Sequence, residues 1–171
     1  ESMPNLLYVP NPLLRQKAEI IKSVGAEEKK IAKKMMDVML RAPGVGLAAN
    51  QIGVLKQIVT IFFVEKESNK EIQYTLYNPK IISYSSETIS MEEGCLSLPE
   101  QFSEIERPKK ISLEYLDEKN NLIKKDADGI EARILQHEID HLSGKLFVDY
   151  LSSLKRNIMI KKVQKYLKNK A

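Results

Sequence analysis

The sequence predicts an α+β fold in which mainly antiparallel β-sheets pack around a central helix, with one further helix towards each end of the chain. Strand-forming segments cluster between residues 57 and 124, whereas helical periodicity is found at 27–41, 129–144 and 151–171. Strands and helices therefore do not alternate along the chain as they would in a parallel β-α-β fold.

Size and composition are those of an ordinary globular domain. The chain has 171 residues, of which 43% are hydrophobic and 29% charged, and we expect residues 1–171 to form a single domain. No apolar run approaches the roughly eighteen residues of a membrane helix, and no signal-peptide pattern opens the chain. One cysteine cannot form a disulfide within the chain. We therefore expect a reducing, cytoplasmic setting without a membrane partner.

Two helical segments are expected before the first strand. Residues 4–16 contain three prolines, which predicts an extended lead followed by a short helical turn at Pro12–Arg15. Residues 27–41 are expected to form a helix that ends at Pro43. Its apolar side chains at helical spacing are Ile31, Met35, Val38, Met39 and Ala42. Such a stripe is far more typical of a core-facing helix than of a cofactor surface.

Residues 44–53, G-V-G-L-A-A-N-Q-I-G, are rich in small side chains, which let the backbone approach a ligand or another element closely. The segment lacks the lysine and the serine or threonine of a phosphate-binding loop, and its third glycine is out of place for a dinucleotide fingerprint. Tight packing is at least as good an interpretation as ligand contact.

The middle of the chain carries the strand signals. Residues 57–65 are mostly apolar and β-prone, which predicts a buried strand followed by a polar turn. Shorter strands are expected at 72–77, 80–84 and 87–91. Residues 110–116 alternate in polarity, and we expect them to pair with 122–124 across a turn at 117–121.

Residues 137–141 read H-E-I-D-H and contain the only two histidines of the chain. On a helix, His137 and His141 lie one turn apart on the same face, so both imidazoles can bind one metal ion. Glu138 then lies where its carboxylate can reach a metal-bound water. The expected fold is thus one of sheets packed around a central metal-binding helix.

The local signals favour this helix. Asp126 or Asp128 can cap its start, Gly144 can end it, and no proline interrupts it. Ile130 and Ile134 continue the histidine face as an apolar stripe. Two histidines at this spacing also arise by chance, and a histidine on an apolar face is usually a hydrogen-bonded core residue. The confinement of both histidines to one well-capped helix favours the metal interpretation.

Cys95 follows Gly94 and lies four residues before Pro99, so it is expected in a turn or at a strand end. A single cysteine is most often a small buried hydrophobic residue. A metal site built on His137 and His141 needs at least one more protein ligand, however, and the chain has no third histidine. Cys95 is the only remaining soft ligand, although a carboxylate can also serve.

The end of the chain is expected to form an amphipathic helix at residues 151–171. Its apolar positions are Leu151, Leu154, Ile158, Met159, Val163, Tyr166 and Leu167. Residues 152–171 carry seven basic and no acidic side chains, which leaves 20 basic and 23 acidic residues in the rest of the chain. The basic face is either a solvated surface of a helix packed on the body or a contact for RNA or another anionic surface.

Three segments together resemble the peptide deformylases. That family has the motifs G-x-G-L-A-A-x-Q, E-G-C-L-S and Q-H-E-x-D-H-L-x-G, which this chain matches at 44–51, 93–97 and 136–144. Pro12–Arg15 is similar to a fourth, N-terminal motif of the family. The resemblance covers residues 4 to 150 and treats 151–171 as a basic C-terminal helix of variable role.

The resemblance implies a single catalytic domain that removes the formyl group from the N-terminal formylmethionine of newly synthesised polypeptides and releases formate. Cys95, His137 and His141 match the family's metal ligands, and Glu138 matches the general acid/base. Activated water would attack the formyl carbon. Gln51 and the N–H of Leu96 match the donors that stabilise the resulting oxyanion. Fe²⁺ is the metal that the resemblance implies, with Zn²⁺, Ni²⁺ or Co²⁺ able to replace it on handling.

The resemblance also assigns substrate contacts. They are Val45, Gly46, Met91, Glu93, Gly94, Ile130 and Ile134. Val45 and Gly94 would present backbone groups to an extended peptide, and the methionine side chain would enter an apolar pocket near Met91 and Ile134. Phe102 departs from the family, where many relatives have a polar or basic residue.

Two other functions are compatible with parts of the sequence. A metalloprotease also uses H-E-x-x-H, but it usually takes its third ligand from beyond the helix, where this chain has no soft ligand. A non-catalytic module with a structural metal and an RNA-binding tail would leave Glu138 and Gln51 without a task. We expect formyl-Met nascent peptides as the partner, with ribosome contact through the basic helix and no binding to DNA.

Overall fold

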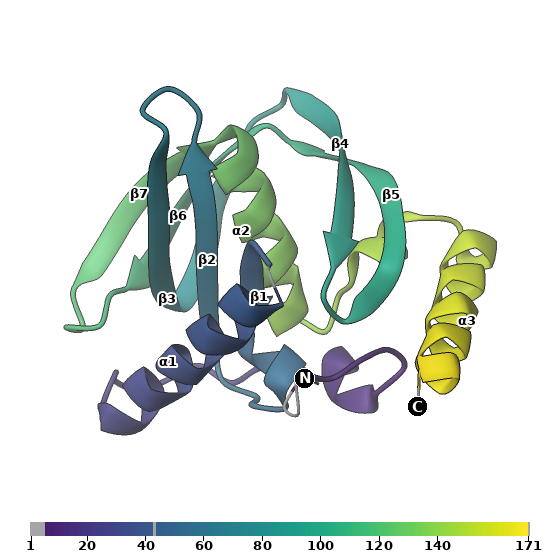
Figure 1. The fold of residues 1–171 in the computed structure, drawn as a ribbon. Helices are drawn as coiled ribbons and strands as arrows, with labels where there is room; N and C mark the ends of the chain where they lie inside the picture. The colour runs from purple at the N-terminus through teal and green to yellow at the C-terminus, as the bar shows by residue number, and fades with distance from the viewer. Residues whose placement is uncertain (1–5, 43, 171) are drawn as a thin grey trace.

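Helix α2 lies between two antiparallel β-sheets (Figure 1). The computed structural model describes residues 6–42 and 44–170. The strands are β1 (Gly46–Ala48), β2 (Ile58–Glu65), β3 (Lys70–Tyr84), β4 (Thr88–Cys95), β5 (Leu98–Pro108), β6 (Lys110–Leu116) and β7 (Leu122–Asp128). The helices are α1 (Ala26–Arg41), α2 (Gly129–Leu142) and α3 (Ser153–Lys170), with short 3-10 helices at Pro12–Arg15, Ala49–Ile52 and Phe147–Tyr150. The expected α+β class is confirmed.

The larger sheet has the strand order β1-β2-β3-β6-β7, and every pairing in it is antiparallel. The predicted hairpin is confirmed as β6 and β7, although β7 continues to Asp128 and leads directly into α2. β4 and β5 form a separate two-stranded sheet, the β4–β5 ribbon, on the other side of α2 (Figure 1). The fold therefore brings two sheets to the same helix.

Strand β2 is buried on both faces, which explains its mostly apolar sequence. Val59 and Ile61 pack in one core with Ile134 of α2, whereas Ile58 packs in a second core with Met39 of α1. Successive side chains of a strand point to opposite faces, so α2 covers one face of the sheet and α1 covers the other. The prediction of a buried strand here is confirmed.

Helix α1 begins at Ala26, one residue before the expected start. The Gly25 N–H donates to the Glu28 side chain (2.8 Å), which satisfies an amide that the first turn leaves free. Met35 and Met39 are fully buried, so the expected apolar stripe is the packed face. Pro43, which was expected to end the helix, and the first two residues of the lead at 4–16 lie outside the described residues.

The two short strands expected at 72–77 and 80–84 are a single strand, β3, so this prediction was wrong. Its pairing with β6 shifts register between Tyr77 and Lys80. Asn78 has φ +52°, and its side chain binds the N–H and the carbonyl of Ile21 (2.8 and 2.7 Å). The Asn-Pro sequence is therefore the site of a β-bulge and does not end the strand.

The β4–β5 ribbon was only partly predicted. The strand expected at 87–91 extends to Cys95, and β5 was not predicted. Leu98, Ile105 and Arg107 are the buried residues of β5, but the segment begins with Leu98-Pro99 and ends at Pro108, and these prolines weaken its strand signal. Met91 pairs with Ile105 and Gly94 pairs with Phe102 across the ribbon.

Helix α3 packs its Met159–Val163–Leu167 side against a third core formed with β5 and Phe147. Leu154 and Ile158, which were expected on the packed face, are 70% and 44% exposed, so this part of the prediction was wrong. At about 100° per residue, both lie roughly 140° or more around the helix from Val163. Among the residues described, no helix combines the length and apolar character needed to cross a membrane.

We predict that Asp149 stabilises the fold by joining the segment after α2 to the Pro12–Arg15 turn. Arg15 donates to both of its oxygens (2.6 and 3.1 Å), and the Leu146 N–H donates to one of them (2.9 Å). Asp149→Asn should lower the free energy of unfolding by about 1–2 kcal/mol at neutral pH, measured by urea denaturation. Asp37→Asn, at an exposed position of α1, is the control and should have no effect.

The difference in unfolding free energy between the wild-type and Asp149→Asn proteins should also depend on pH. Burial would raise the pKa of Asp149, but the hydrogen bonds from Arg15 and the Leu146 N–H lower it. A lowered folded-state pKa gives stability that is complete above the ordinary aspartate pKa and is lost as the pH falls through the folded value. The stabilities of the two proteins should therefore approach each other as the pH falls below about 4. A difference that stays constant at lower pH would contradict the stabilising role of the Asp149 carboxylate.

Candidate metal centre

Helix α2 presents two imidazoles on one face. Asp128 is the N-cap, and its side chain accepts from the Gly129 N–H (2.6 Å), as one of the two expected caps. At the other end Gly144 has φ +78°, a conformation that glycine adopts readily. The rings of His137 and His141 lie 5.2 Å apart, centroid to centroid, and both are buried.

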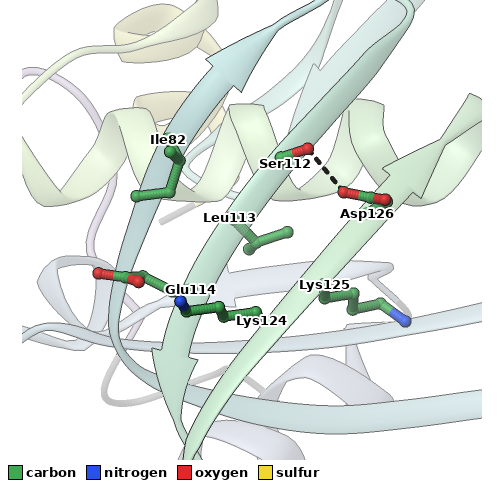
Figure 2. A pocket seen from close by; sticks show the side chains of 7 residues that line it. All are labelled: Ile82, Ser112, Leu113, Glu114, Lys124, Lys125 and Asp126. Carbon is green, nitrogen blue, oxygen red and sulfur yellow. Dashed lines mark hydrogen bonds between the residues drawn. The ribbon is translucent and has the colours of Figure 1, made fainter.

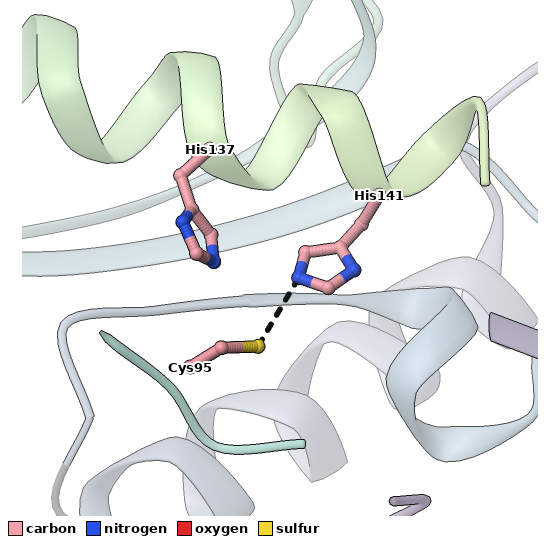
Figure 3. A group of neighbouring side chains, drawn as sticks. All are labelled: Cys95, His137 and His141. Atoms are coloured by element: carbon pink, nitrogen blue, oxygen red, sulfur yellow. Dashed lines mark hydrogen bonds between the residues drawn. The ribbon is translucent and has the colours of Figure 1, made fainter. Parts of the chain in front are cut away.

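Cys95 lies opposite the two histidines, at the end of β4 (Figure 3). Its Sγ is 3.4 Å from His141 Nε2, and the ligand atoms of all three residues lie within 4.8 Å of one another. The structure therefore brings together the three metal-ligand candidates from two elements that are far apart in the sequence. One thiolate and two imidazoles suit Zn²⁺ and other divalent transition metals, and three protein ligands leave a coordination position for water or substrate.

The side chains behind this face are consistent with metal binding. Glu93 Oε1 lies 2.8 Å from His137 Nδ1, so that Nδ1–H can donate to the carboxylate while Nε2 points towards Cys95 (Figure 3). His141 Nδ1 is buried and has no hydrogen-bond partner among the described residues. Phe147 stacks beside His137 at 6.1 Å between ring centroids. The set thus fits a divalent ion held by oriented imidazoles.

Glu93 contacts His137 and two arginines. Arg107 Nε and Arg133 Nη1 each lie 2.5 Å from its Oε2, and all three side chains are at most 6% exposed. Burial alone would raise the pKa of Glu93, but the hydrogen bonds from His137 and Arg107 lower it to about 2. No pattern in the sequence predicted the two arginines, although Arg107 occupies a buried position of β5.

Glu138 is 4% exposed and lies at the edge of the ligand cluster. Its Oε2 is 3.9 Å from His137 Nε2, and its Oε1 has no hydrogen-bond partner among the residues described. Burial raises the pKa of Glu138 to about 7. A Cβ at Gly46 would lie 2.6 Å from Glu138 Oε2, so the glycine leaves room for the carboxylate.

Gln51 is held in a fixed orientation. Its Oε1 accepts from the Ala48 N–H (2.9 Å), and its Nε2 donates to Ser97 Oγ (3.1 Å) and lies 3.6 Å from Cys95 Sγ. The amide nitrogen is therefore directed to the ligand cluster. The small residues of 44–53 allow both tight packing and an open site, because β1 packs into the core while Gly46 lines the site.

A groove of about 590 Å³ opens beside these residues. Its lining includes Val45, Gly46, Gln51, Gly94, Cys95, Leu96 and Glu138. Phe102, which is 59% exposed, lines its outer part and lies directly over Gly94. Two chain segments expected to meet a substrate, those of Val45 and Gly94, thus line one groove with Cys95.

The other predicted substrate contacts do not line this groove. Met91 lies in the ribbon opposite Ile105, Ile130 is 39% exposed in the first turn of α2, and Ile134 is buried in the core of the large sheet. A second hollow of about 350 Å³, on the outer face of β3, β6 and β7, contains none of the predicted site residues (Figure 2). The predicted catalytic residues Gln51, Leu96 and Glu138 therefore line the first groove, whereas Met91, Ile130 and Ile134 do not.

Comparison with known proteins agrees with this geometry. Residues 3–157 match the family described as Polypeptide deformylase. A protein named Peptide deformylase from Pelagibacter ubique (strain HTCC1062) is 47% identical over 171 residues, which cover 99% of this chain and 98% of that protein. The crystal structure of peptide deformylase from Ehrlichia chaffeensis has a TM-score of 0.92 at 37% identity, covering 97% of both chains. A structure from the same organism in complex with actinonin has a TM-score of 0.89 at 39% identity, covering 95% of this chain and 96% of that chain.

We predict that this site binds about one divalent ion per chain through Cys95, His137 and His141. Cys95→Ala and His141→Ala should each weaken Zn²⁺ binding by at least about a hundredfold, because two ligands remain. Equilibrium dialysis followed by elemental analysis measures the effect. Glu138→Gln, which removes no ligand, is the control, and wild-type affinity in Cys95→Ala would contradict the ligand set.

Proposed function

This chain belongs to the polypeptide deformylase family, and we propose that its Cys95–His137–His141 centre carries out the family's reaction. The activity is metal-dependent hydrolysis that removes the formyl group from the N-terminal formylmethionine of newly synthesised polypeptides. The observation that supports the site best is the convergence of Glu138 and Gln51 on the three ligand side chains at one end of the groove.

Three side chains would hold the metal. We propose Fe²⁺ as the working ion, with Zn²⁺, Ni²⁺ or Co²⁺ in its place after handling, and this choice rests on the family. A divalent ion bound there would polarise the formyl oxygen and make a water molecule more acidic. Every other part of the reaction falls to groups of the chain itself.

Glu138 would move the proton. Its carboxylate lies beside His137 Nε2, and burial raises its pKa to about 7, so it can both accept and release a proton near neutral pH. It would take a proton from the attacking water as the oxygen bonds to the formyl carbon. It would then give that proton to the departing amine as the C–N bond breaks. Formate and a free N-terminal amine are the products.

Gln51 and Leu96 would stabilise the negative charge that develops on the formyl oxygen. The Gln51 side chain is already held by Ala48 and Ser97, so its Nε2–H needs no rearrangement during the reaction. Leu96 follows Cys95 directly, which places its N–H beside the thiolate ligand. Donors fixed before the reaction are worth more than donors that must reorient.

The substrate backbone would add to the free edge of β1. The Val45 carbonyl accepts from the Phe62 N–H of β2, and backbone groups alternate in direction along a strand, so those of Gly46 face away from β2. Gly94 of β4 lines the opposite side of the groove. We propose that an extended peptide lies between Gly46 and Gly94, in the strand-addition mode.

The remaining substrate contacts are proposed on the family resemblance. Met91, Ile130 and Ile134 would surround the methionine side chain together with the His137 ring. For Glu93 the contacts support an indirect role, in which its carboxylate orients His137 for binding. Phe102 offers an exposed aromatic face to a substrate residue beyond the methionine.

Family membership excludes the two alternative functions. A metalloprotease of the H-E-x-x-H class and a non-catalytic module with a structural metal both conflict with the match over residues 3–157. We propose in addition that 1–171 is one catalytic domain, with a core at 4–150 and a basic helix at 151–171. The single core that joins β5, Phe147 and α3 supports the assignment of the C-terminal helix to the same domain.

We predict that the iron- or nickel-loaded protein, prepared without oxygen, releases formate from N-formyl-Met peptides. Glu138→Gln should keep its metal but lose about 10²–10⁴-fold in kcat, because the proton acceptor is gone. Formate release is followed by a coupled assay, and bound metal by elemental analysis. Absence of formate release by the loaded wild-type protein would contradict the proposed function, and full turnover by Glu138→Gln would contradict the proton-transfer assignment alone.

We also propose that α3 contacts the ribosome. Its basic side chains lie beside Leu154 and Ile158, which are exposed, so the helix offers charge and apolar area together. Changing Lys161, Lys162 and Lys165 to Glu should weaken co-sedimentation with ribosomes by at least about tenfold at low salt. The matched control changes Lys29, Lys30 and Lys33 of α1, which are also exposed. Equal binding by the two triple variants would refute the contact.

A further inference from the structure

The metal ligands come from two elements that share no hydrophobic core. His137 and His141 belong to α2, whose apolar residues pack against the large sheet, whereas Cys95 belongs to the β4–β5 ribbon, whose apolar residues pack with Phe147 and α3. Among the described residues, no buried apolar cluster contains both α2 and ribbon side chains. Phe147 stacks on His137 from the ribbon's core, but the direct contacts between helix and ribbon that set the distance between the thiolate and the imidazoles are polar.

Arg133 makes the most extensive of these contacts. It lies on α2 one turn before His137 and is 5% exposed. Its Nη1 donates to the Ile105 carbonyl of β5 (2.7 Å), and its Nη2 donates to the Ile89 carbonyl of β4 (2.6 Å). One guanidinium thus binds the backbone of both ribbon strands to the helix.

The same guanidinium reaches a carboxylate that contacts a metal ligand. Arg133 Nη1 lies 2.5 Å from Glu93 Oε2, and Glu93 Oε1 lies 2.8 Å from His137 Nδ1. Glu93 stands on β4 two residues before Cys95. Arg133 is therefore connected to the ribbon next to the thiolate and to the helix next to the first imidazole.

Two other side chains support this connection without replacing it. Arg107 of β5 binds Glu93 and also Asp140 of α2 (2.9 Å to Asp140), and Gln136 Nε2 donates to the Pro108 carbonyl (2.9 Å). Two arginines face two carboxylates, so the charges of this group balance. Of these groups, only Arg133 binds the backbone of both strands.

We propose that Arg133 is a positioning residue that fixes the separation of Cys95 from His137 and His141, and with it the geometry and affinity of the metal centre. The proposal rests on the proposed function, since it assigns these three residues as ligands. Arg133 does not line the groove, so it acts through the ribbon and Glu93 and not on the substrate. An arginine is required because its planar fork can bind two carbonyls and a carboxylate at fixed angles, whereas a lysine ammonium is a single point of charge on a flexible chain.

The test uses the Co²⁺-loaded protein, whose absorption spectrum reports thiolate coordination and ligand geometry. Arg133→Lys keeps the charge next to Glu93 and should fold, as checked by circular dichroism. We expect a shifted Co²⁺ spectrum and metal release to a chelator at least about threefold faster than in the wild-type protein. Arg133→Met, where it folds, should show a larger shift and release about tenfold faster or more. Arg156→Met on α3, which makes none of these contacts, should match the wild-type protein in both measurements.

A purely structural role would lower the melting temperature of the metal-free protein but leave the Co²⁺ spectrum of the folded protein unchanged. A wild-type spectrum and wild-type release rate in folded Arg133→Lys would therefore overturn the proposal. Neither measurement depends on formate release, so a failure of this inference is separate from a failure of the proposed function.

Discussion

The carboxylate of Glu93 is buried beneath the ligand cluster, and its charge is stable there only because three side chains from other parts of the fold bind it. An unpaired charge in such a place would cost several kcal/mol, so the carboxylate requires its partners as much as they require it. Those partners come from β5 and from two successive turns of α2. Satisfying this one group therefore brings the ribbon, the helix and the first imidazole into a single arrangement.

Burial has the opposite outcome for the pKa of Glu138. Glu93 is surrounded by donors, which keep it ionised, whereas Glu138 Oε1 lacks a partner among the described residues and its pKa rises to about 7. Two carboxylates a short distance apart thus have different protonation behaviour because their environments differ. Glu93 can therefore orient the His137 imidazole, whereas Glu138 can accept and release a proton near neutral pH.

The groove lies where two sheets approach the same helix. β1 contributes a short edge at Gly46, the ribbon contributes Gly94 and Cys95, and α2 contributes Glu138, with His137 and His141 next to Cys95. Small side chains at the two glycines are required by contact, since a Cβ at Gly46 would meet Glu138 and one at Gly94 would meet Phe102. The position of Phe102 over Gly94 gives this chain an aromatic surface at the outer end of the groove.

Features set by neighbours in the chain could be read from the sequence. The spacing of His137 and His141, the capping of α2 and the double burial of β2 follow from helical and strand periodicity, which are local properties. The third ligand could be proposed for Cys95 because the chain has only one cysteine and two histidines. The oxyanion roles of Gln51 and Leu96 were inferred from the family motifs, and local periodicity alone did not predict them.

Only the tertiary structure decided how these segments meet. β5 was not predicted because its prolines weaken the strand signal, whereas in the fold the segment is held as a strand by its pairing with β4. Leu154 and Ile158 were assigned to the wrong face because an amphipathic pattern does not show which apolar residues of a helix will be covered by the core. Arg107 and Arg133 look in the sequence like surface charges, and only their long-range contacts with Glu93, Asp140 and the ribbon carbonyls show that they are interior groups. The sequence by itself determined the chemical groups of the site, whereas their separation depends on contacts between residues far apart in the chain, which no local pattern encodes.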